Sequence, residues 1–449
     1  MKIMMVMHTF NNFGGIINHC EHLVAGLKEL GHDVTFAYLK GNKTVRPVEI
    51  PTELKEGYEI GIGTGYPVHQ GDGWIAPYYS YKVKESIDKF VEDANKHDLV
   101  IWQSIFGFKN KDTEKSLDWL PMIEKVTTKQ VPIIHDANLK KLYPWISLFE
   151  KHFAGLACVH PAAYDSADFM STPRALILNP QDIDGVPPTP KFAGRENKIL
   201  SIQTFKRWKR VDDLIRAVPY MPNVKTLVGG YGIEAAYMMS KDKCKDEYFA
   251  VKQYDPDVTP DREGKRIWEN AENSGNFEYL GFISGAKRDE ILATSKFLVD
   301  PSWSNTFGEH FNRVVIDAMR IGTVPIAVNF GVSNNADGIG TVLKAGVNYC
   351  MLKKDYTPKQ YGEAIANFCN MSEDDYKQIQ LNNFELIKQF DRKVVAQHYI
   401  DLAMGKETGY LKELKTKSNH DPAIIRNARN MFDEHFEAPT SQDLDEFFA

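Results

Sequence analysis

The chain has 449 residues, of which 43% are hydrophobic, 25% charged and 12% aromatic, and this is the composition of a folded globular protein. A single hydrophobic core rarely grows to this length, so we expect two compact domains. The formal net charge of −6 excludes a general attraction of the whole chain to nucleic acid or anionic lipid. A polyanionic partner therefore has to be met by a local basic patch.

The amino terminus starts with a short apolar run and then turns polar and glycine-rich. The run is too short for the core of a signal peptide or for a membrane span, so we expect a buried first strand. The five cysteines lie far apart without paired spacing, which argues against a disulfide framework and a structural zinc site. We therefore expect a cytoplasmic protein with no membrane partner.

The first part of the chain predicts a strand, a glycine turn, a helix and a second strand. The first strand covers residues 2–10, and the following helix carries apolar residues at helical spacing: Ile16, Cys20, Leu23 and Leu27. Gly31 follows the helix where a left-handed cap is usual, and residues 33–39 resume the strand pattern. This order predicts a βαβ unit.

The rest of the chain continues the alternation of strands and helices. Apolar runs at residues 99–102, 131–134 and 155–159 alternate with helix-like stretches, as a parallel sheet requires. Residues 57–80 are rich in glycine and aromatic residues and predict a long loop. Prolines, glycines and charges interrupt the pattern at residues 182–198, and a second series of strands and helices follows. The chain is therefore predicted to be an α/β protein of two domains.

Residues 301–328 carry the clearest chemical pattern, a strand ending in Pro-Ser, two acids eight positions apart, and a helix leading into Gly-x-x-Pro. The acids are Glu309 and Asp317, and eight residues make about 2.2 helical turns, so both lie on nearly one face. A helix amino terminus favours a pyrophosphate. Here the helix is predicted to open with the backbone N–H groups of Phe311, Asn312 and Arg313. An amphipathic helix with incidental acids is the alternative.

This segment resembles the signature of the retaining glycosyltransferases of family four, which have the GT-B fold. The resemblance implies two facing Rossmann-like domains with parallel sheets and a cleft between them. It also implies a UDP-sugar as co-substrate, with neither a cofactor nor a metal. Glu309 would meet the donor sugar as a catalytic residue, and Asp317, in place of the usual glutamate, would reach the ribose. His310 and Asn312 would lie beside the donor, although glycine is common at the second of these positions.

The same resemblance implies a division of the chain. Residues 1–182 would form the acceptor-binding domain, and residues 183–198 the linker. Residues 199–388 would form the domain that binds the nucleotide sugar. A crossover helix at residues 389–405 would return to the first domain, and no role is predicted for the tail at residues 406–449.

Residues 201–215 resemble the family segment in which an arginine and a lysine neutralise the donor diphosphate. Lys209 matches the lysine, whereas Thr204 stands at the arginine position. Lys206 or Arg207 would supply the missing charge. Cations suit this place because the leaving diphosphate gains negative charge as the glycosidic bond breaks. A solvated basic helix start is the alternative.

Turns that follow strands supply further candidates for donor binding. Gly14 and Gly15 lie between the first strand and the first helix, where a backbone without side chains can approach a phosphate or sugar closely. The second domain adds Gly230, in a glycine turn after a predicted strand, and Phe282 and Ile283, at the end of the apolar segment at residues 278–283. Ordinary turn chemistry is an alternative explanation of these glycines.

His135 and Asp136 directly follow the predicted strand at residues 131–134. Both therefore lie at the carboxyl end of a parallel strand, where open α/β sheets bind their ligands. A carboxylate beside a histidine suits acid-base chemistry, so both are candidate catalytic residues. A helix cap by Asp136, with His135 satisfied in the core, is the alternative.

Several short pieces together resemble the DNA α-glucosyltransferases of T-even phages, which glucosylate 5-hydroxymethylcytosine in duplex DNA. The pieces are residues 31–35, residues 98–101 with Ser104, His135-Asp136, His160 with Asp165 and Phe169, and Thr204 with Trp208-Lys209. The resemblance implies double-stranded DNA as the acceptor and the host cytoplasm as the location. His135 would contact the donor sugar, and Asp136 would lie nearest the acceptor hydroxyl.

A DNA acceptor requires phosphate contacts and a surface for an extruded base. The candidates are basic and aromatic residues near predicted strand ends or in the long loop: Lys43, Arg46, Trp74, Lys109, Lys111 and Lys140. Taken one at a time, these residues are explained at least as well as solvated lysines and as part of a packed aromatic loop.

Two other functions stay open. One is sugar transfer to a cell-envelope or lipid-linked glycan, for which a basic amphipathic helix is expected and the first helix is not one. The other is an inactive nucleotide-sugar or DNA-binding module, which donor turnover would exclude. His19 and His22 flank Glu21 and resemble a metal pair only superficially, so we expect core or surface histidines. We expect a monomer or a weak oligomer.

Overall fold

The protein is described from a computed structural model. The structure describes residues 1–8, 15–39, 58–60, 81–103, 108–109, 116–117, 120–135, 144–184, 191–203, 205, 209–230, 262–283, 285–302, 313–328, 343, 345–353 and 355–410.

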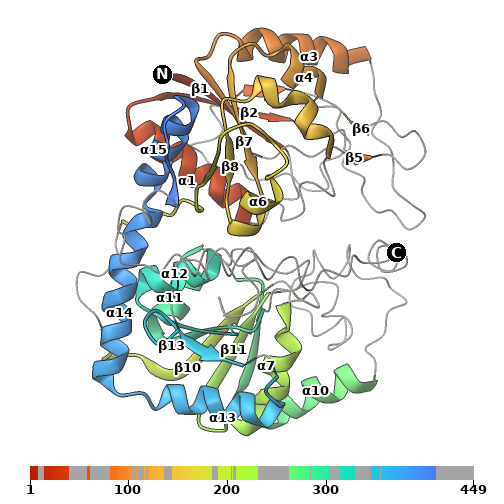
Figure 1. Cartoon of the computed structure of the whole chain (residues 1–449). Coiled ribbons are helices and arrows are strands. Elements are labelled where there is room, and N and C mark those ends of the chain that lie inside the picture. The colour runs from red at the N-terminus through yellow and green to blue at the C-terminus, as the bar shows by residue number, and fades with distance from the viewer. Residues whose placement is uncertain are drawn as a thin grey trace.

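The first half of the chain forms a seven-stranded sheet in the order β3-β2-β1-β4-β7-β8-β9, and all neighbouring strands are parallel (Figure 1). The strands are β1 (Lys2–His8), β2 (Asp33–Leu39), β3 (Tyr58–Ile60), β4 (Leu99–Trp102), β7 (Lys129–Ile134), β8 (Leu156–Cys158) and β9 (Arg174–Leu176). The helices are α1 (Gly15–Glu29), α3 (Tyr81–Ala94), α4 (Leu120–Lys125), η1 (Pro144–His152) and α6 (Pro161–Ser166). A separate antiparallel pair joins β5 (Phe108–Lys109) and β6 (Ser116–Leu117).

Helices cover both faces of this sheet, which explains the nearly continuous apolar sequence of its strands. In β1, Met4 and Val6 pack in one buried cluster with Phe90 of α3. Ile3 and Met5 point to the opposite face and pack in a second cluster with residues of α1. Successive side chains of a strand alternate between faces, so an apolar residue is required at each of these positions.

The second half forms a six-stranded parallel sheet in the order β12-β11-β10-β13-β14-β15. The strands are β10 (Glu196–Ile202), β11 (Lys225–Gly229), β12 (Phe277–Gly281), β13 (Ser295–Asp300), β14 (Val324–Val328) and β15 (Cys350–Leu352). The helices are α7 (Val211–Ala217), η3 (Val218–Tyr220), α10 (Arg262–Asn273), α11 (Gly285–Thr294), α12 (Arg313–Ile321), α13 (Pro358–Cys369), α14 (Glu373–Ile387) and η5 (Lys388–Phe390). This sheet too has a buried cluster on each face.

The last described helix, α15 (Arg392–Ala403), leaves the second sheet and packs against α1 of the first (Figure 1). The approach is close, because a Cβ atom added at Gly26 would lie 2.1 Å from the carbonyl oxygen of Arg392. The Arg392 guanidinium also pairs with Glu29 at 2.5 Å, with Asp182 at 3.1 Å and with Asp184 at 3.2 Å. Packing and charge together therefore fix the start of α15 on the first domain.

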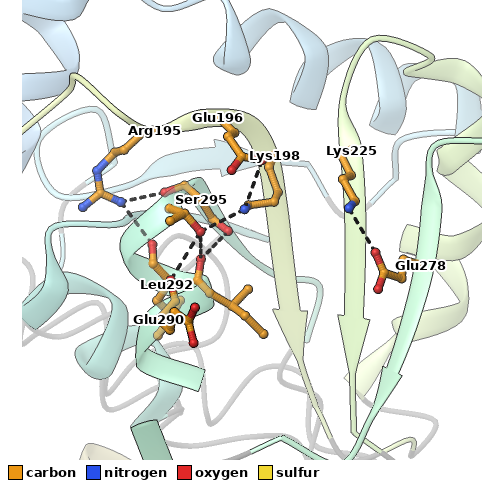
Figure 2. Close-up of polar contacts among 10 residues, drawn as sticks. Arg195, Glu196, Lys198, Lys225, Glu278, Glu290, Leu292 and Ser295 are labelled. Atoms are coloured by element: carbon orange, nitrogen blue, oxygen red, sulfur yellow. Dashed lines mark hydrogen bonds and ion pairs between the residues drawn. The ribbon is translucent and has the colours of Figure 1, made fainter. Parts of the chain in front are cut away.

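Arg195 joins the start of the second sheet to the ends of two helices. Figure 2 shows its contacts with Leu292, at the end of α11, and with Ser295. Its Nη1 donates to the carbonyl oxygens of Leu292 at 3.1 Å and Ser295 at 2.6 Å, and its Nη2 donates to that of Ile321 at 2.9 Å. Carbonyls at helix ends have no partner within the helix, so an arginine fork satisfies them. Figure 2 also shows the more exposed pair of Lys225 and Glu278, at 3.0 Å.

The structure confirms the predicted α/β class and the parallel sheets. It also confirms that Gly31 follows α1 in the left-handed region, with φ of 81°. One expectation is wrong in part, because Tyr58–Ile60 forms the edge strand β3 rather than the start of a loop. A three-residue edge strand is too short to produce a recognisable alternation. Among the described helices, none has the length and apolar character needed to span a membrane.

Candidate active site

The strand order places the candidate site residues at the carboxyl edges of the two sheets. In each sheet the order reverses at one point, between β1 and β4 in the first and between β10 and β13 in the second. Open parallel sheets bind ligands outside the carboxyl ends of their strands at such switch points. The segments that follow β7, β10, β11 and β13 are therefore the expected ligand-binding segments.

His135 follows β7 at the edge of the first sheet, as predicted, and is half-buried. Its Nε2 lies 3.2 Å from Nε2 of Gln103, the residue after β4. His160, which follows β8, donates from Nε2 to the carbonyl oxygen of His135 at 2.9 Å and accepts the N–H of Ala163 on Nδ1 at 3.0 Å. Burial lowers the pKa of His135 to about 4, so its imidazole is neutral at pH 7.

His19 of α1 is buried beside His135, and its ring stands nearly perpendicular to the ring of His135 at 5.3 Å between centroids. Both nitrogens of His19 have protein partners, Asn179 Oδ1 at 2.5 Å and the Tyr399 hydroxyl at 3.1 Å. The expectation that this is a core histidine is confirmed. Within the described residues, no group of three metal-ligating side chains comes together.

A buried aspartate anchors the carboxyl edge of the second sheet. Asp300 ends β13, and its Oδ1 accepts from Nε2 of Gln203 at 2.8 Å and from the backbone N–H of Ser302 at 3.1 Å. This bridge ties the ends of β10 and β13 together at the switch point. Lys209 lies six positions after Gln203 with only 8% of its surface exposed. Arg210, the next residue, adopts the left-handed region with φ of 50°, which is uncommon for a residue with a side chain.

Gly230 follows β11 with φ of 119°, in a region that side chains rarely adopt. A Cβ atom there would lie 1.8 Å from the carbonyl oxygen of Gln203, so only glycine fits. Its own N–H donates to the oxygen of Gly281 at 2.8 Å, and its carbonyl accepts from the Tyr279 hydroxyl at 2.7 Å. The glycine therefore brings two backbone segments together and has its polar groups satisfied. Phe282 is half-buried near this turn, and Ile283 is buried.

Arg313 is the first residue of α12 and is 9% exposed. Its Nη2 donates to Oε1 of Gln181 at 3.2 Å, whereas its Nε and Nη1 are buried without a hydrogen-bond partner in the structure. Burial lowers the pKa of Arg313 to about 10, and the nearby carboxylates of Asp317 and Glu21 raise it. Burial and the positive charge of Arg313 together lower the pKa of His22 to about 3. Glu21 and His22 belong to α1, so the amino end of α12 faces the first domain here.

The remaining candidates divide into four groups. Gly15 is the first residue of α1. Lys109 lies in β5, where only the backbone is described. The others lie outside the described residues: Gly14, Lys43, Arg46, Trp74, Lys111, Asp136, Lys140, Thr204, Lys206, Arg207, Glu309, His310, Phe311 and Asn312. Asp317 lies on α12, where its Oδ2 accepts from Nη1 of Arg288 at 2.7 Å.

Residues 186–383 match the family model described as "Glycosyl transferases group 1". That segment contains Lys209, Gly230, Asp300 and Arg313. The protein is a glycosyltransferase. Its second half is a group 1 glycosyltransferase domain, and the buried residues at the carboxyl edge of the second sheet lie inside it.

Solved glycosyltransferase structures resemble the whole chain. A glycosyltransferase from Rickettsia africae has 14% identity and a TM-score of 0.58, with 90% of this chain and 98% of that chain covered. TarM from S. aureus has 12% identity and a TM-score of 0.60, with coverages of 90% and 99%. An α-glucosyltransferase in complex with UDP-glucose and DNA has 12% identity and a TM-score of 0.54, with coverages of 90% and 99%. No curated protein matches the sequence significantly. The GT-B fold of this glycosyltransferase is thereby confirmed.

Residues that the sequence analysis did not single out as site residues lie beside those it did. One of them is Asn179, a buried residue three positions beyond the end of β9. Gln103, Gln203 and Asp300 are buried polar residues that directly follow or end parallel strands. The position of each at a strand end was a usable signal. Nothing in the local sequence indicated the left-handed backbone of Arg210.

Proposed function

We propose that this glycosyltransferase moves a sugar, with retention of anomeric configuration, from a UDP-sugar to the hydroxymethyl group of 5-hydroxymethylcytosine in duplex DNA. The donor half of the proposal rests on one observation. Lys209, Gly230 and Arg313 gather at the carboxyl edge of the second sheet, inside the segment that the glycosyltransferase family model matches. That edge is where a nucleotide is expected in such a sheet.

The electrostatics of this edge support a diphosphate leaving group. Arg313 has two buried nitrogens without hydrogen-bond partners at the amino end of α12, and a helix amino end adds a favourable dipole. Lys209 supplies a second cation after β10. Positive charges that already lie where the leaving phosphate gains negative charge lower the activation barrier of sugar transfer. The site does not have to rearrange to supply them. The uracil nucleotide is inferred from solved relatives that contain UDP or UDP-glucose.

The first domain supplies the other side of the reaction. His135 is neutral, so its imidazole binds the donor sugar by hydrogen bonding and does not add a positive charge. In this proposal Asp136, the next residue in the sequence, acts on the acceptor hydroxyl, and Glu309 binds the donor sugar. The acceptor oxygen bonds to the anomeric carbon on the face from which UDP departs. Its proton passes to Asp136 or to the departing phosphate oxygen.

The DNA acceptor rests on the resemblance of several short pieces to phage DNA glucosyltransferases and on solved relatives that hold DNA. The second candidate is a cell-envelope glycan, which the likeness to TarM and to the lipopolysaccharide galactosyltransferase WaaB favours. One observation weighs against docking of the first helix on a membrane. In α1 the sheet-facing side is buried, and Gly26 and Glu29 contact α15.

Labelled UDP-sugars and a set of acceptors test the proposal. We expect label in duplex DNA that carries 5-hydroxymethylcytosine and none in the same duplex with cytosine. Lys209→Ala and Glu309→Ala should each lower transfer by a factor on the order of a hundred or more. The matched control is Lys225→Ala, at the opposite end of the neighbouring strand, which should leave transfer unchanged. Label in lipid-linked glycan instead would favour the second candidate, and no turnover with any acceptor would indicate an inactive binding module.

A further inference from the structure

We infer that His19 is a positioning residue for His135 and that Tyr399, on the helix that returns from the second domain, holds His19 in its working orientation. The inference rests on the proposed role of His135 in sugar transfer. It concerns a row of four side chains, of which Tyr399, His19 and Asn179 are buried and His135 is half-buried. They come from α15, α1, the segment after β9 and the end of β7.

The hydrogen bonds of His19 define one orientation of its ring. Asn179 Oδ1 can only accept, so the Nδ1 atom of His19 carries the proton in the 2.5 Å contact. Nε2 then has a lone pair, which accepts the hydroxyl proton of Tyr399 across 3.1 Å. Burial, together with the nearby His135, holds the pKa of His19 well below its usual value, so this neutral form persists. Turning the ring over would put Cδ2 in the place of Nδ1 and Cε1 in the place of Nε2, so both hydrogen bonds would be lost.

The ring of His19 in turn limits how His135 can lie. The two rings meet edge to face, with 78° between their planes and 5.3 Å between their centroids. Such contacts prefer a defined angle because the ring edge is positive and the face negative. Gln103 fixes Nε2 of His135 at 3.2 Å, and His160 fixes its carbonyl oxygen at 2.9 Å. His19 adds a further constraint, against rotation of the imidazole.

Tyr399 makes this constraint depend on α15. The helix follows α14 of the second domain and packs on α1, and Tyr399 is fully buried at the contact. The orientation of the histidine at the acceptor side is therefore set by a helix whose chain arrives from the donor side. A shift of α15 along α1 would move the hydroxyl that holds Nε2 of His19.

Tyr399→Phe removes one oxygen atom and keeps the aromatic ring. We expect kcat for sugar transfer to fall about tenfold, which corresponds to one lost hydrogen bond acting on the transition state. The KM for the UDP-sugar should stay within about twofold, because the second domain binds the nucleotide. A double-mutant cycle separates a positioning role of Tyr399 from a purely structural one, because it measures whether the effect of Tyr399→Phe on kcat depends on His135. In the His135→Ala background, Tyr399→Phe should cause no further loss of kcat.

Tyr376→Phe is the matched control. Tyr376 is a buried tyrosine of α14 whose hydroxyl donates to the carbonyl oxygen of Lys296, at the amino edge of the second sheet. It should lower the melting temperature and leave kcat unchanged. If the wild type transfers sugar, His135→Ala impairs transfer, and Tyr399→Phe is neutral or its effect adds to that of His135→Ala, this inference alone is overturned. If the wild type transfers no sugar, the proposed function fails and the inference fails with it.

Discussion

Arg288 of α11 donates to the carboxylate of Asp317 of α12 at 2.7 Å, so the second acid of the glycosyltransferase motif sits in an ion pair. Arg288 also pairs with its neighbour Asp289 at 2.7 Å, which accepts from Arg320 at 2.6 Å. Asp317 is only 6% exposed. The pair fixes the side chain of the acid that the family resemblance implies as the ribose contact.

Replacing Arg288 with methionine should therefore destabilise the protein. It leaves the buried Asp317 carboxylate without its ion-pair partner, and breaking a buried pair from one side costs on the order of 3 kcal/mol. The free energy of unfolding from urea titration measures the loss. The control is Arg216→Met, because Arg216 pairs with Asp212 at 3.7 Å near the surface and should cost less than about 1 kcal/mol. Equal losses in the two variants would contradict the importance of the buried pair.

Gly230→Ala should impair both folding and donor binding. The added Cβ would lie 1.8 Å from the carbonyl oxygen of Gln203, so the turn after β11 has to move, at a cost of about 3 kcal/mol. Gly275→Ala is the comparison, since Gly275 also has positive φ but has open space around it. It should cost about 1 kcal/mol and leave the KM for the UDP-sugar unchanged. A Gly230→Ala variant with wild-type KM would show that this turn does not touch the donor.

Arg195→Met should lower stability without changing catalysis. Arg195 lies at the amino edge of the second sheet, opposite the candidate site, and donates to carbonyl oxygens from the ends of α11 and α12 (Figure 2). Loss of these charge-assisted hydrogen bonds should cost roughly 3 to 5 kcal/mol. Lys225→Met, which breaks the exposed pair with Glu278, should cost under about 1 kcal/mol. Calorimetry and kcat on the same preparations check the prediction, and a fall in kcat for Arg195→Met would contradict it.

Stability should fall as the pH drops below about 6.5, the ordinary pKa of histidine. Burial lowers the pKa of His135 to about 4 and that of His22 to about 3, and it lowers the pKa of His19 well below the usual value. Between these folded values and pH 6.5 the unfolded chain binds more protons, so each histidine removes up to about 1.4 kcal/mol of stability per pH unit of acidification. Urea unfolding at pH 7 and pH 5 measures the difference. Equal free energies at the two pH values would contradict the lowered pKa values, because they would show that the folded and unfolded protein take up the same number of protons.

The sequence predicted the elements well where apolar periodicity was long, as in β1 and α1. It also placed His135 at a strand end correctly, because four apolar residues before it marked a buried strand. It did not reveal that His19 lies against His135 or that Arg288 pairs with Asp317. Both contacts join elements far apart in the chain, and their partners depend on how helices pack, which local patterns do not encode.

The most direct test of the account is the mass of the nucleosides released from duplex DNA containing 5-hydroxymethylcytosine after incubation with the protein and a UDP-sugar. We predict a glycosylated 5-hydroxymethyl-2′-deoxycytidine with the wild type and almost none with Lys209→Ala, together with one UDP released per sugar transferred. Unmodified nucleosides, with UDP released at the same rate whether or not the modified DNA is present, would contradict it.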